Sequence, residues 1–187
     1  MGATVSRLHL DLACHALAAG GVIAYPTEGV WGLGCEPLNV HACGRVLALK
    51  RRAAAKGFIL IASEFAQVAP FLASLTPAQL TPVKASGPGA VTWLLPAASW
   101  VPRHLTGGRA TLAIRVTAHP VAGALCARYG GPIVSTSANA SGRRPARTAL
   151  QVQRQFGARL DYLLAGALGG LAGPTPIRDL ASGKAVR

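Results

Sequence analysis

The apolar positions along the chain follow two spacings, one typical of helices and one typical of buried strands. Residues 8–19 repeat apolar side chains at helical spacing, and Gly20-Gly21 directly after them is a common helix end. The next run, VIAY at 22–25, is short and continuously apolar, as in a strand that is buried on both faces. The chain is therefore expected to begin with a helix followed by a strand.

The two patterns alternate to the end of the chain. Further strands are predicted at 29–35, 58–62, 91–96, 111–117, 132–138 and 161–166, and a last one near the end of GGLAGPTPIRDL at 169–180. Further helices are predicted at 40–50, at 64–84 with a break near Thr76-Pro77, at 119–130 and at 148–156. Because neither a repeat nor a linker interrupts this order, we expect one α/β domain over residues 1–187.

Charge is the unusual feature of the composition. Nineteen Lys and Arg residues stand against six Asp and Glu residues, which gives a net charge of +13 and a pI of about 11.1. Such a balance indicates a polyanionic partner, such as nucleic acid, a nucleotide or an anionic membrane. Fifteen of the nineteen cations are Arg, whose planar fork matches phosphate and carboxylate oxygens. A GC-rich genome is the alternative explanation for part of this excess on the surface.

The cysteines and the N-terminus bear on the cell compartment. The four cysteines form no C-x-x-C pair, so the sequence has neither zinc-finger spacing nor a dense disulfide framework. The N-terminus lacks the order of charge, apolar run and cleavage site of a signal peptide. No apolar run reaches the ~18 residues of a membrane span. We therefore expect a cytoplasmic protein with reduced thiols and no membrane contact.

Several common catalytic motifs are missing. The chain contains no G-x-x-x-x-G-K-[ST], no G-x-G-x-x-G and no G-x-S-x-G. The six acids are scattered along the sequence, which argues against a paired-carboxylate glycosidase. An active site in this chain is expected to work with cations, hydroxyls and backbone amides.

Four cations follow the predicted helix at 40–50, namely Lys50, Arg51, Arg52 and Lys56. Cations in the last turn of a helix complement its dipole, which would be a purely structural role. A helix-end pair and a second Lys across a tight turn can also converge on one polyphosphate. The residues alone leave both interpretations open.

Other polar residues lie on or directly after predicted strands. Arg115 interrupts an apolar strand, and because a buried unpaired cation is costly, it should face an anion in a cleft or a structural ion pair. Ser135, Ser137 and Asn139 follow an apolar strand with donors and acceptors suited to phosphate or ribose oxygens. Thr27 ends another strand, either in a binding site or in an ordinary turn.

Taken in chain order, six stretches resemble the YrdC-type threonylcarbamoyl-AMP synthases. They are PTEGVWGLG, K-x-R-x-x-x-K-G, SGPGAVTWLLP, LAIRVTAHP, STSANASG and PTPIRDL, and the likeness covers residues 10–187. The resemblance implies a YrdC-like α/β fold (α+β in some schemes), with a twisted mixed β-sheet flanked by helices and an electropositive cleft. The length is similar to that of the short bacterial form, which lacks an extra C-terminal domain.

The resemblance also implies a nucleotidyltransferase reaction. L-threonine, bicarbonate and ATP would give L-threonylcarbamoyladenylate and pyrophosphate, with Mg²⁺ held by the ATP phosphates and not by the protein. Partner proteins, the tRNA-threonylcarbamoyl transferase, would then pass the group to an adenosine beside the tRNA anticodon. Such a transfer needs positioning and neutralisation of charge more than a covalent nucleophile.

The family's site residues carry over onto matching positions. The catalytic pair would be Lys50 and Arg52. The resemblance implies that ATP is bound by Lys50, Arg52, Lys56, Thr111, Ser137, Asn139 and Arg187. It implies that L-threonine is bound by Thr27, Arg115, Ser135 and Thr175. Two positions depart from the family pattern. Ala53 stands where many relatives have Pro, and Pro176 removes the N–H donor of the residue after Thr175.

Two other function classes remain as alternatives. The first is a non-catalytic module that binds double-stranded RNA or tRNA, supported by the net charge and by Arg143, Arg144 and Arg147. The second is a phosphosugar enzyme on a similar fold, which no motif in the chain requires. An enzyme in a tRNA pathway could also keep a basic surface that contacts tRNA.

Overall fold

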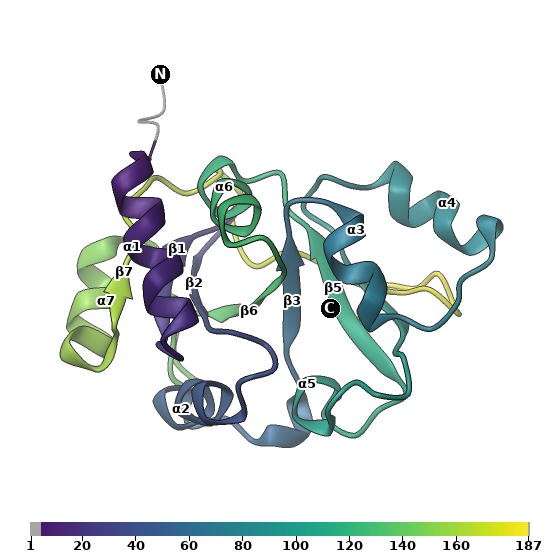
Figure 1. The fold of residues 1–187 in the computed structure, drawn as a ribbon, viewed down its shortest axis with the longest axis horizontal. Helices are drawn as coiled ribbons and strands as arrows, with labels where there is room; N and C mark the ends of the chain where they lie inside the picture. Colours follow the sequence, from purple (N-terminus) through teal and green to yellow (C-terminus); the bar gives the residue numbers. More distant parts are fainter. Residues whose placement is uncertain (1–4, 187) are drawn as a thin grey trace.

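The described residues, 5–186, form an eight-stranded mixed sheet in this computed structural model (Figure 1). The strand order is β7-β1-β2-β6-β3-β5-β4-β8. The strands are β1 (Ile23–Pro26), β2 (Trp31–Gly34), β3 (Ile59–Ala62), β4 (Thr92–Pro96), β5 (Thr111–Val116), β6 (Ile133–Ser137), β7 (Tyr162–Leu163) and β8 (Ile177–Asp179). The α/β class and the mixed sheet predicted from the sequence are confirmed.

Seven α-helices and three short 3-10 helices connect the strands within the described part of the chain. The α-helices are α1 (Arg7–Ala18), α2 (Val40–Lys50), α3 (Phe65–Val68), α4 (Pro77–Ala85), α5 (Arg103–Thr106), α6 (Pro120–Tyr129) and α7 (Ala149–Phe156). The 3-10 helices are η1 (Ala54–Lys56), η2 (Ala69–Phe71) and η3 (Gly157–Arg159). Each of these helices is too short or too polar to cross a membrane.

The helix ends follow from local side-chain chemistry. The side chain of Asn39 accepts a hydrogen bond from the Ala42 amide (2.9 Å) and so starts α2. Arg51 ends the same helix with a left-handed backbone (φ 49°), a conformation that non-glycine residues adopt only occasionally. Because of this turn, the side chains of Lys50, Arg51 and Arg52 point in different directions.

The predicted boundaries differ from the structure in three places. The segment 64–84 is broken before α4, near Thr76-Pro77 as predicted, but its first helix, α3, ends at Val68 and is followed by η2 and an extended stretch, because Pro70 cannot continue it. The strand predicted at 161–166 forms ladder pairs only at Tyr162 and Leu163. The short helix α5 was not predicted, since four residues give no readable period.

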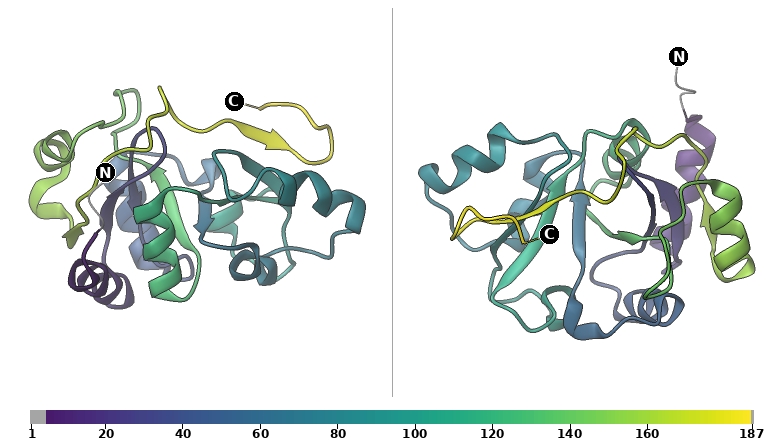
Figure 2. Two further views of the ribbon diagram at one scale, coloured as in Figure 1. Left: turned by 90° about the horizontal axis from the view of Figure 1, so that it is seen from above. Right: turned by 180° about the vertical axis from the view of Figure 1, so that it is seen from behind.

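The layers around the sheet explain where a site can form. Helices α1 and α6 pack together on β1 through an apolar cluster that includes Leu17, Tyr25 and Leu125, and Figure 1 shows them in front of the sheet. The right panel of Figure 2 shows the C-terminal segment crossing the opposite face. On β5, the core residues Leu112 and Ile114 alternate with residues that line a cavity.

Candidate active site

A cavity of about 330 Å³ is lined by residues of the sheet and of the C-terminal segment. Its lining comes from β2, β3, β5 and β6, from the turn after α2, and from the segment before β8. The cations that line it are Arg52, Lys56, Arg109 and Arg115. The hydroxyls that line it are on Thr27, Thr106, Thr111, Ser135, Thr136, Ser137 and Thr175. Among the described lining residues there is no carboxylate, so the cavity suits an anionic ligand.

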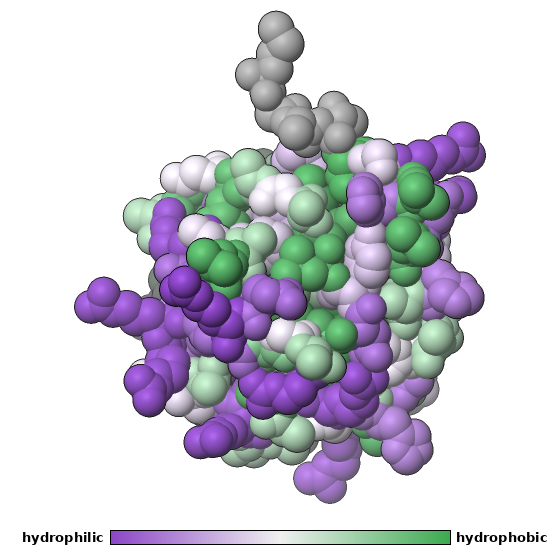
Figure 3. Space-filling model, turned by 90° about the vertical axis from the view of Figure 1, so that its left-hand side faces the viewer, coloured by the Kyte–Doolittle hydropathy of each residue, from purple (hydrophilic) through white to green (hydrophobic). Residues whose placement is uncertain are grey.

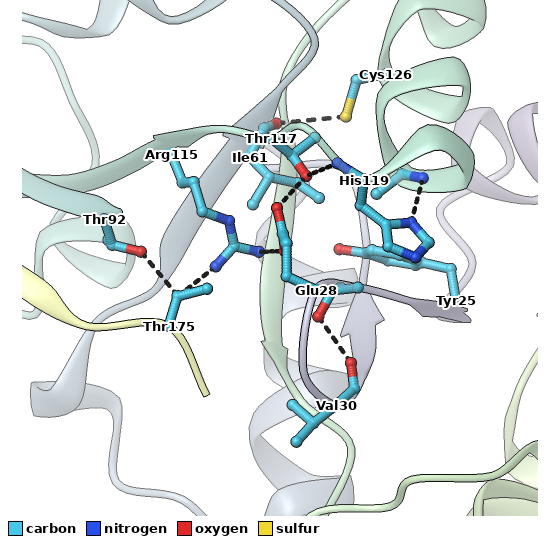
Figure 4. A network of polar contacts seen from close by, with 12 residues as sticks. Tyr25, Glu28, Val30, Ile61, Thr92, Arg115, Thr117, His119, Cys126 and Thr175 are labelled. Atoms are coloured by element: carbon cyan, nitrogen blue, oxygen red, sulfur yellow. Dashed lines mark hydrogen bonds and ion pairs between the residues drawn. The ribbon is translucent and has the colours of Figure 1, made fainter. Parts of the chain in front are cut away.

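Arg115 is the most buried cation of this lining, with 4% of its surface exposed. Figure 4 shows its guanidinium between two side chains. Nη1 donates a hydrogen bond to Thr175 Oγ1 (2.6 Å), and Nη2 lies 3.3 Å from Glu28 Oε2. Arg115 therefore has the structural ion pair that was considered for it, and it also lines the cavity.

Lys50 lies behind the cavity wall. Its Nζ donates hydrogen bonds to the carbonyl oxygens of Ser137 and Asn139 (2.9 Å for Asn139), and it is not among the described lining residues. Burial lowers the pKa of the Lys50 ammonium to about 7, and the charge of Arg52 adds to this shift. The Lys50 carbonyl also accepts from the Ser141 amide (2.7 Å), so the end of α2 is tied to the loop after β6.

Arg52 and Lys56 lie on the turn that contains η1. Arg52 Nη2 donates to the carbonyl oxygen of Gly57 (3.1 Å), which holds the guanidinium across this turn. Arg109 donates from the other side, through Nη1 to Ala55 O and Nη2 to Lys56 O, both at 2.9 Å. The two guanidinium groups therefore brace the turn that presents Lys56 to the cavity.

The serines after the apolar part of β6 also reach the cavity. Ser135 and Ser137 both line it, whereas Asn139 does not, among the described residues. The Asn139 amide group instead donates to the carbonyl oxygens of Ala140 (3.1 Å) and Arg143 (2.7 Å) and shapes its own loop. Thr27 lines the cavity while its Oγ1 donates to the Val30 carbonyl oxygen (2.7 Å).

The C-terminal segment closes one side of the cavity and is held closely to the turn after β1. A Cβ on Gly29 would lie only 1.8 Å from the Gly173 carbonyl oxygen, so only glycine fits at this contact. Arg147 donates from Nη1 to the carbonyl oxygens of Gly29 (3.2 Å) and Ala172 (2.7 Å). Thr175 shares a hydrogen bond with Thr92 (3.3 Å). This segment is therefore fixed at three places along the cavity.

The structure brings together most of the residues predicted from the sequence. Eight of the eleven predicted site residues line the cavity, namely Thr27, Arg52, Lys56, Thr111, Arg115, Ser135, Ser137 and Thr175. Lys50 and Asn139 lie in the adjoining wall, and Arg187 lies outside the described residues. Sequence reasoning missed Arg109, which stands in a loop without a periodic pattern. The only feature of the sequence that pointed to Arg109 as a site residue was its position two residues before a predicted strand.

Comparison with known proteins shows the family of the chain. The Sua5/YciO/YrdC family model, described as "Telomere recombination", matches residues 15–187. A threonylcarbamoyl-AMP synthase of Halorhodospira halophila is 57% identical over 171 residues, covering 91% of this chain and 90% of that protein. A threonylcarbamoyl-AMP synthase of Nitrosococcus oceani is 53% identical, covering 94% of this chain and 95% of that protein.

Solved structures show the same fold. P. abyssi Sua5 complexed with L-threonine is 30% identical, with a TM-score of 0.86 over 92% of this chain. This chain covers 51% of that longer protein. E. coli YciO is 25% identical, with a TM-score of 0.78 over 92% of this chain and 84% of that protein. The resemblance seen in the motifs is confirmed, and the chain belongs to the Sua5/YciO/YrdC family.

Proposed function

We propose that this chain converts L-threonine, bicarbonate and ATP to L-threonylcarbamoyladenylate and pyrophosphate, and that the cavity described above is its active site. The observation that carries the proposal is the gathering of Arg52, Lys56, Arg109 and Arg115 with seven hydroxyl residues around one cavity. The relatives support the reaction, because threonylcarbamoyl-AMP synthases share about half of their residues with this chain over more than nine-tenths of its length.

We divide the residues of the cavity into two groups, one for each substrate. We assign L-threonine to the end of the cavity with Thr27, Arg115, Ser135 and Thr175, where the Arg115 guanidinium receives the substrate carboxylate. We assign the ATP phosphates to the opposite group, which contains Arg52, Lys56, Thr111 and Ser137, with Arg109 added from the structure. The position between the two groups is where the carbamate formed from threonine and bicarbonate would attack the α-phosphate.

The chemistry requires charge compensation and alignment. The amine and bicarbonate form a carbamate with loss of water, a carbamate oxygen forms a bond to the α-phosphorus, and pyrophosphate leaves with the electrons of the broken P–O bond. Fixed guanidinium and ammonium groups stabilise the charge on the phosphates as this happens. We propose that Lys50 serves ATP through its charge and by fixing the carbonyl groups of Ser137 and Asn139, with which it forms hydrogen bonds.

Mg²⁺ would enter with ATP. The described lining offers hydroxyl oxygens and no carboxylate, which suits an ion that keeps water and phosphate oxygens as its main ligands. The ion would neutralise part of the phosphate charge when bound. Thr111 and Ser137 are the lining hydroxyls in the proposed phosphate group, and they would orient the phosphate oxygens or the water molecules of the ion.

The test is a pyrophosphate-release assay. We expect release that requires both L-threonine and bicarbonate, and a loss of ~10²-fold or more in Lys50→Ala, as for removal of one preorganised charged group. The exposed Lys84→Ala is the matched control and should keep wild-type rates. Folded protein that releases no pyrophosphate with both substrates present would refute the proposal.

The product would be used by a tRNA-threonylcarbamoyl transferase in the cytoplasm, because L-threonylcarbamoyladenylate is an activated mixed anhydride that needs an acceptor.

A direct contact with tRNA is a second candidate function. Arg51, Arg143, Arg144 and Arg159 line a second hollow of about 700 Å³ beside Phe156. Figure 3 shows hydrophilic side chains gathered over the lower part of the face that carries α2 and α7. Such a group of guanidinium groups suits a phosphodiester backbone.

Binding of a tRNA to the double variant Arg143→Glu/Arg144→Glu tests this contact. We expect at least tenfold weaker binding and a shallower salt dependence than in wild type, because fewer counterions are released. The double variant Lys84→Glu/Arg103→Glu has the same change in net charge on other exposed positions and is the control. Equal losses in the two double variants would show that only net charge matters.

A further inference from the structure

Glu28 is a buried acid that the proposed reaction does not use. It is the second residue after β1, is 6% exposed, and is not among the described residues that line the cavity. Its Oε2 lies 3.3 Å from Arg115 Nη2, and its Oε1 accepts a hydrogen bond from Thr117 Oγ1 (2.6 Å). The carboxylate therefore contacts the guanidinium of a residue that lines the cavity, without lining the cavity itself, and Figure 4 shows this pair.

Burying this pair has a cost that packing alone does not explain. Two charges withdrawn from water lose hydration that their attraction only partly restores, and an apolar pair of similar volume is often as stable. The Arg115 Nε and Glu28 Oε2 atoms have no hydrogen-bond partner within the described residues, although Oε2 has its ion-pair contact with Arg115. The ion pair thus leaves one guanidinium donor unused.

The support of Glu28 comes from elements outside the cavity. Thr117 Oγ1 accepts from the His119 amide (3.2 Å), and His119 Nδ1 accepts from the Ala122 amide (3.3 Å) at the start of α6. His119 Nε2 also donates to the Ala167 carbonyl oxygen (3.0 Å). Burial lowers the pKa of His119, in agreement with a neutral ring that donates at one nitrogen and accepts at the other. Glu28 is therefore held by the junction of β5 and α6.

We propose that Glu28 is a positioning residue, whose carboxylate fixes the Arg115 guanidinium in the orientation that receives the carboxylate of the substrate. The proposal rests on the assignment of L-threonine to Arg115. Two contacts hold the guanidinium, one from Glu28 and one from Thr175. Without the carboxylate, a buried cation keeps a single neutral partner, and it gains by turning toward water in the cavity. It would then leave the position that binds substrate.

The first experiment is steady-state kinetics of Glu28→Gln, which keeps the side-chain shape and removes the charge. We expect the KM for L-threonine to rise at least tenfold, with kcat within about threefold and the KM for ATP unchanged. Glu64→Gln removes the charge of an exposed glutamate and should behave as wild type. An unchanged or lowered KM for L-threonine in Glu28→Gln would overturn the proposal. Glu28 would then only neutralise part of the Arg115 charge and would not position the guanidinium.

A second measurement separates this proposal from the proposed function. NMR of the Arg115 Nε–H group should show slow side-chain motion in wild type and faster motion in Glu28→Gln. Thr117→Val removes the hydrogen bond to Glu28 with little change of shape. It should raise the KM for L-threonine and speed up the motion of the Arg115 Nε–H group, each by less than Glu28→Gln does. If wild type shows no threonine-dependent activity, the proposed function fails, while an unaltered Arg115 signal in both variants refutes the role of Glu28. Thr117→Val carries both tests if Glu28→Gln does not fold.

Discussion

The side-chain ammonium of Lys50 lies 2.9 Å from the carbonyl oxygen of Asn139, so the last residue of α2 holds the loop that follows β6. Only 3% of Lys50 is exposed. Burial disfavours the charged form and lowers the pKa of this group to about 7. The ammonium thus sits close to its point of titration under physiological conditions.

This lowered pKa predicts a pH-dependent stability. Between pH 7 and about 10, the unfolded chain binds more protons at Lys50 than the folded protein does, so the free energy of unfolding rises with pH in this window. Lys50→Met removes the titrating group. We expect the urea midpoint of wild type, relative to Lys50→Met, to increase from pH 7 to pH 9. The exposed Lys84→Met is the control, and a pH-independent difference between wild type and Lys50→Met would contradict the shift.

Arg52 and Arg51 provide a matched pair for the ATP site. Arg52 lines the cavity, whereas the left-handed backbone of Arg51 directs its side chain to the second hollow. We expect Arg52→Ala to raise the KM for ATP about tenfold, as for loss of one charge-assisted contact of about 1.4 kcal/mol. Arg51→Gly loses the same charge at a residue whose backbone suits glycine, and its KM should stay within twofold of wild type. Equal effects of the two substitutions would argue for a general charge effect.

Much of the fold could be predicted because its elements have strong local signals. The helix predicted at 40–50 has the bounds of α2, since Asn39 caps its start. The strands at the centre of the sheet were read from continuous apolar runs, which are buried on both faces. The strand order could not be read, because β6 lies between β2 and β3 and this pairing depends on contacts distant in sequence.

The site was predicted less completely than the fold, for a physical reason. A motif identifies which residues belong together, but it does not show whether a side chain points into the cavity or is held by its neighbours. Lys50 and Asn139 belong to the expected motifs, yet their side chains bond to backbone carbonyl oxygens. Arg147, which supported RNA binding in the sequence, donates to the carbonyl oxygens of Gly29 and Ala172. Arg143 and Arg144 line the second hollow instead.

Arg109 tests whether the turn at η1 must be held for ATP binding. Its guanidinium donates to the carbonyl oxygens of Ala55 and Lys56, both at 2.9 Å. Arg109→Ala removes both hydrogen bonds and one cation of the cavity. We expect a KM for ATP raised about tenfold, with faster hydrogen exchange at the Gly57 amide, which bonds to Ala54. The exposed Arg103→Ala is the control. A raised KM with unchanged exchange would assign Arg109 a direct contact with ATP and no role in the turn.

Arg147 tests whether the C-terminal segment is fastened by a single side chain. Its Nη1 group joins Gly29 to Ala172, next to the backbone hydrogen bond from the Leu171 amide to the Glu28 carbonyl oxygen (2.9 Å). Arg147→Ala should increase hydrogen exchange at Leu171 and proteolysis near 171–173, while the urea midpoint of the whole protein changes little because Arg147 is exposed. Arg154→Ala, another exposed arginine beyond the segment, should leave both unchanged. Unaltered exchange at Leu171 in Arg147→Ala would show that the close contact between Gly29 and Gly173 holds the segment without it.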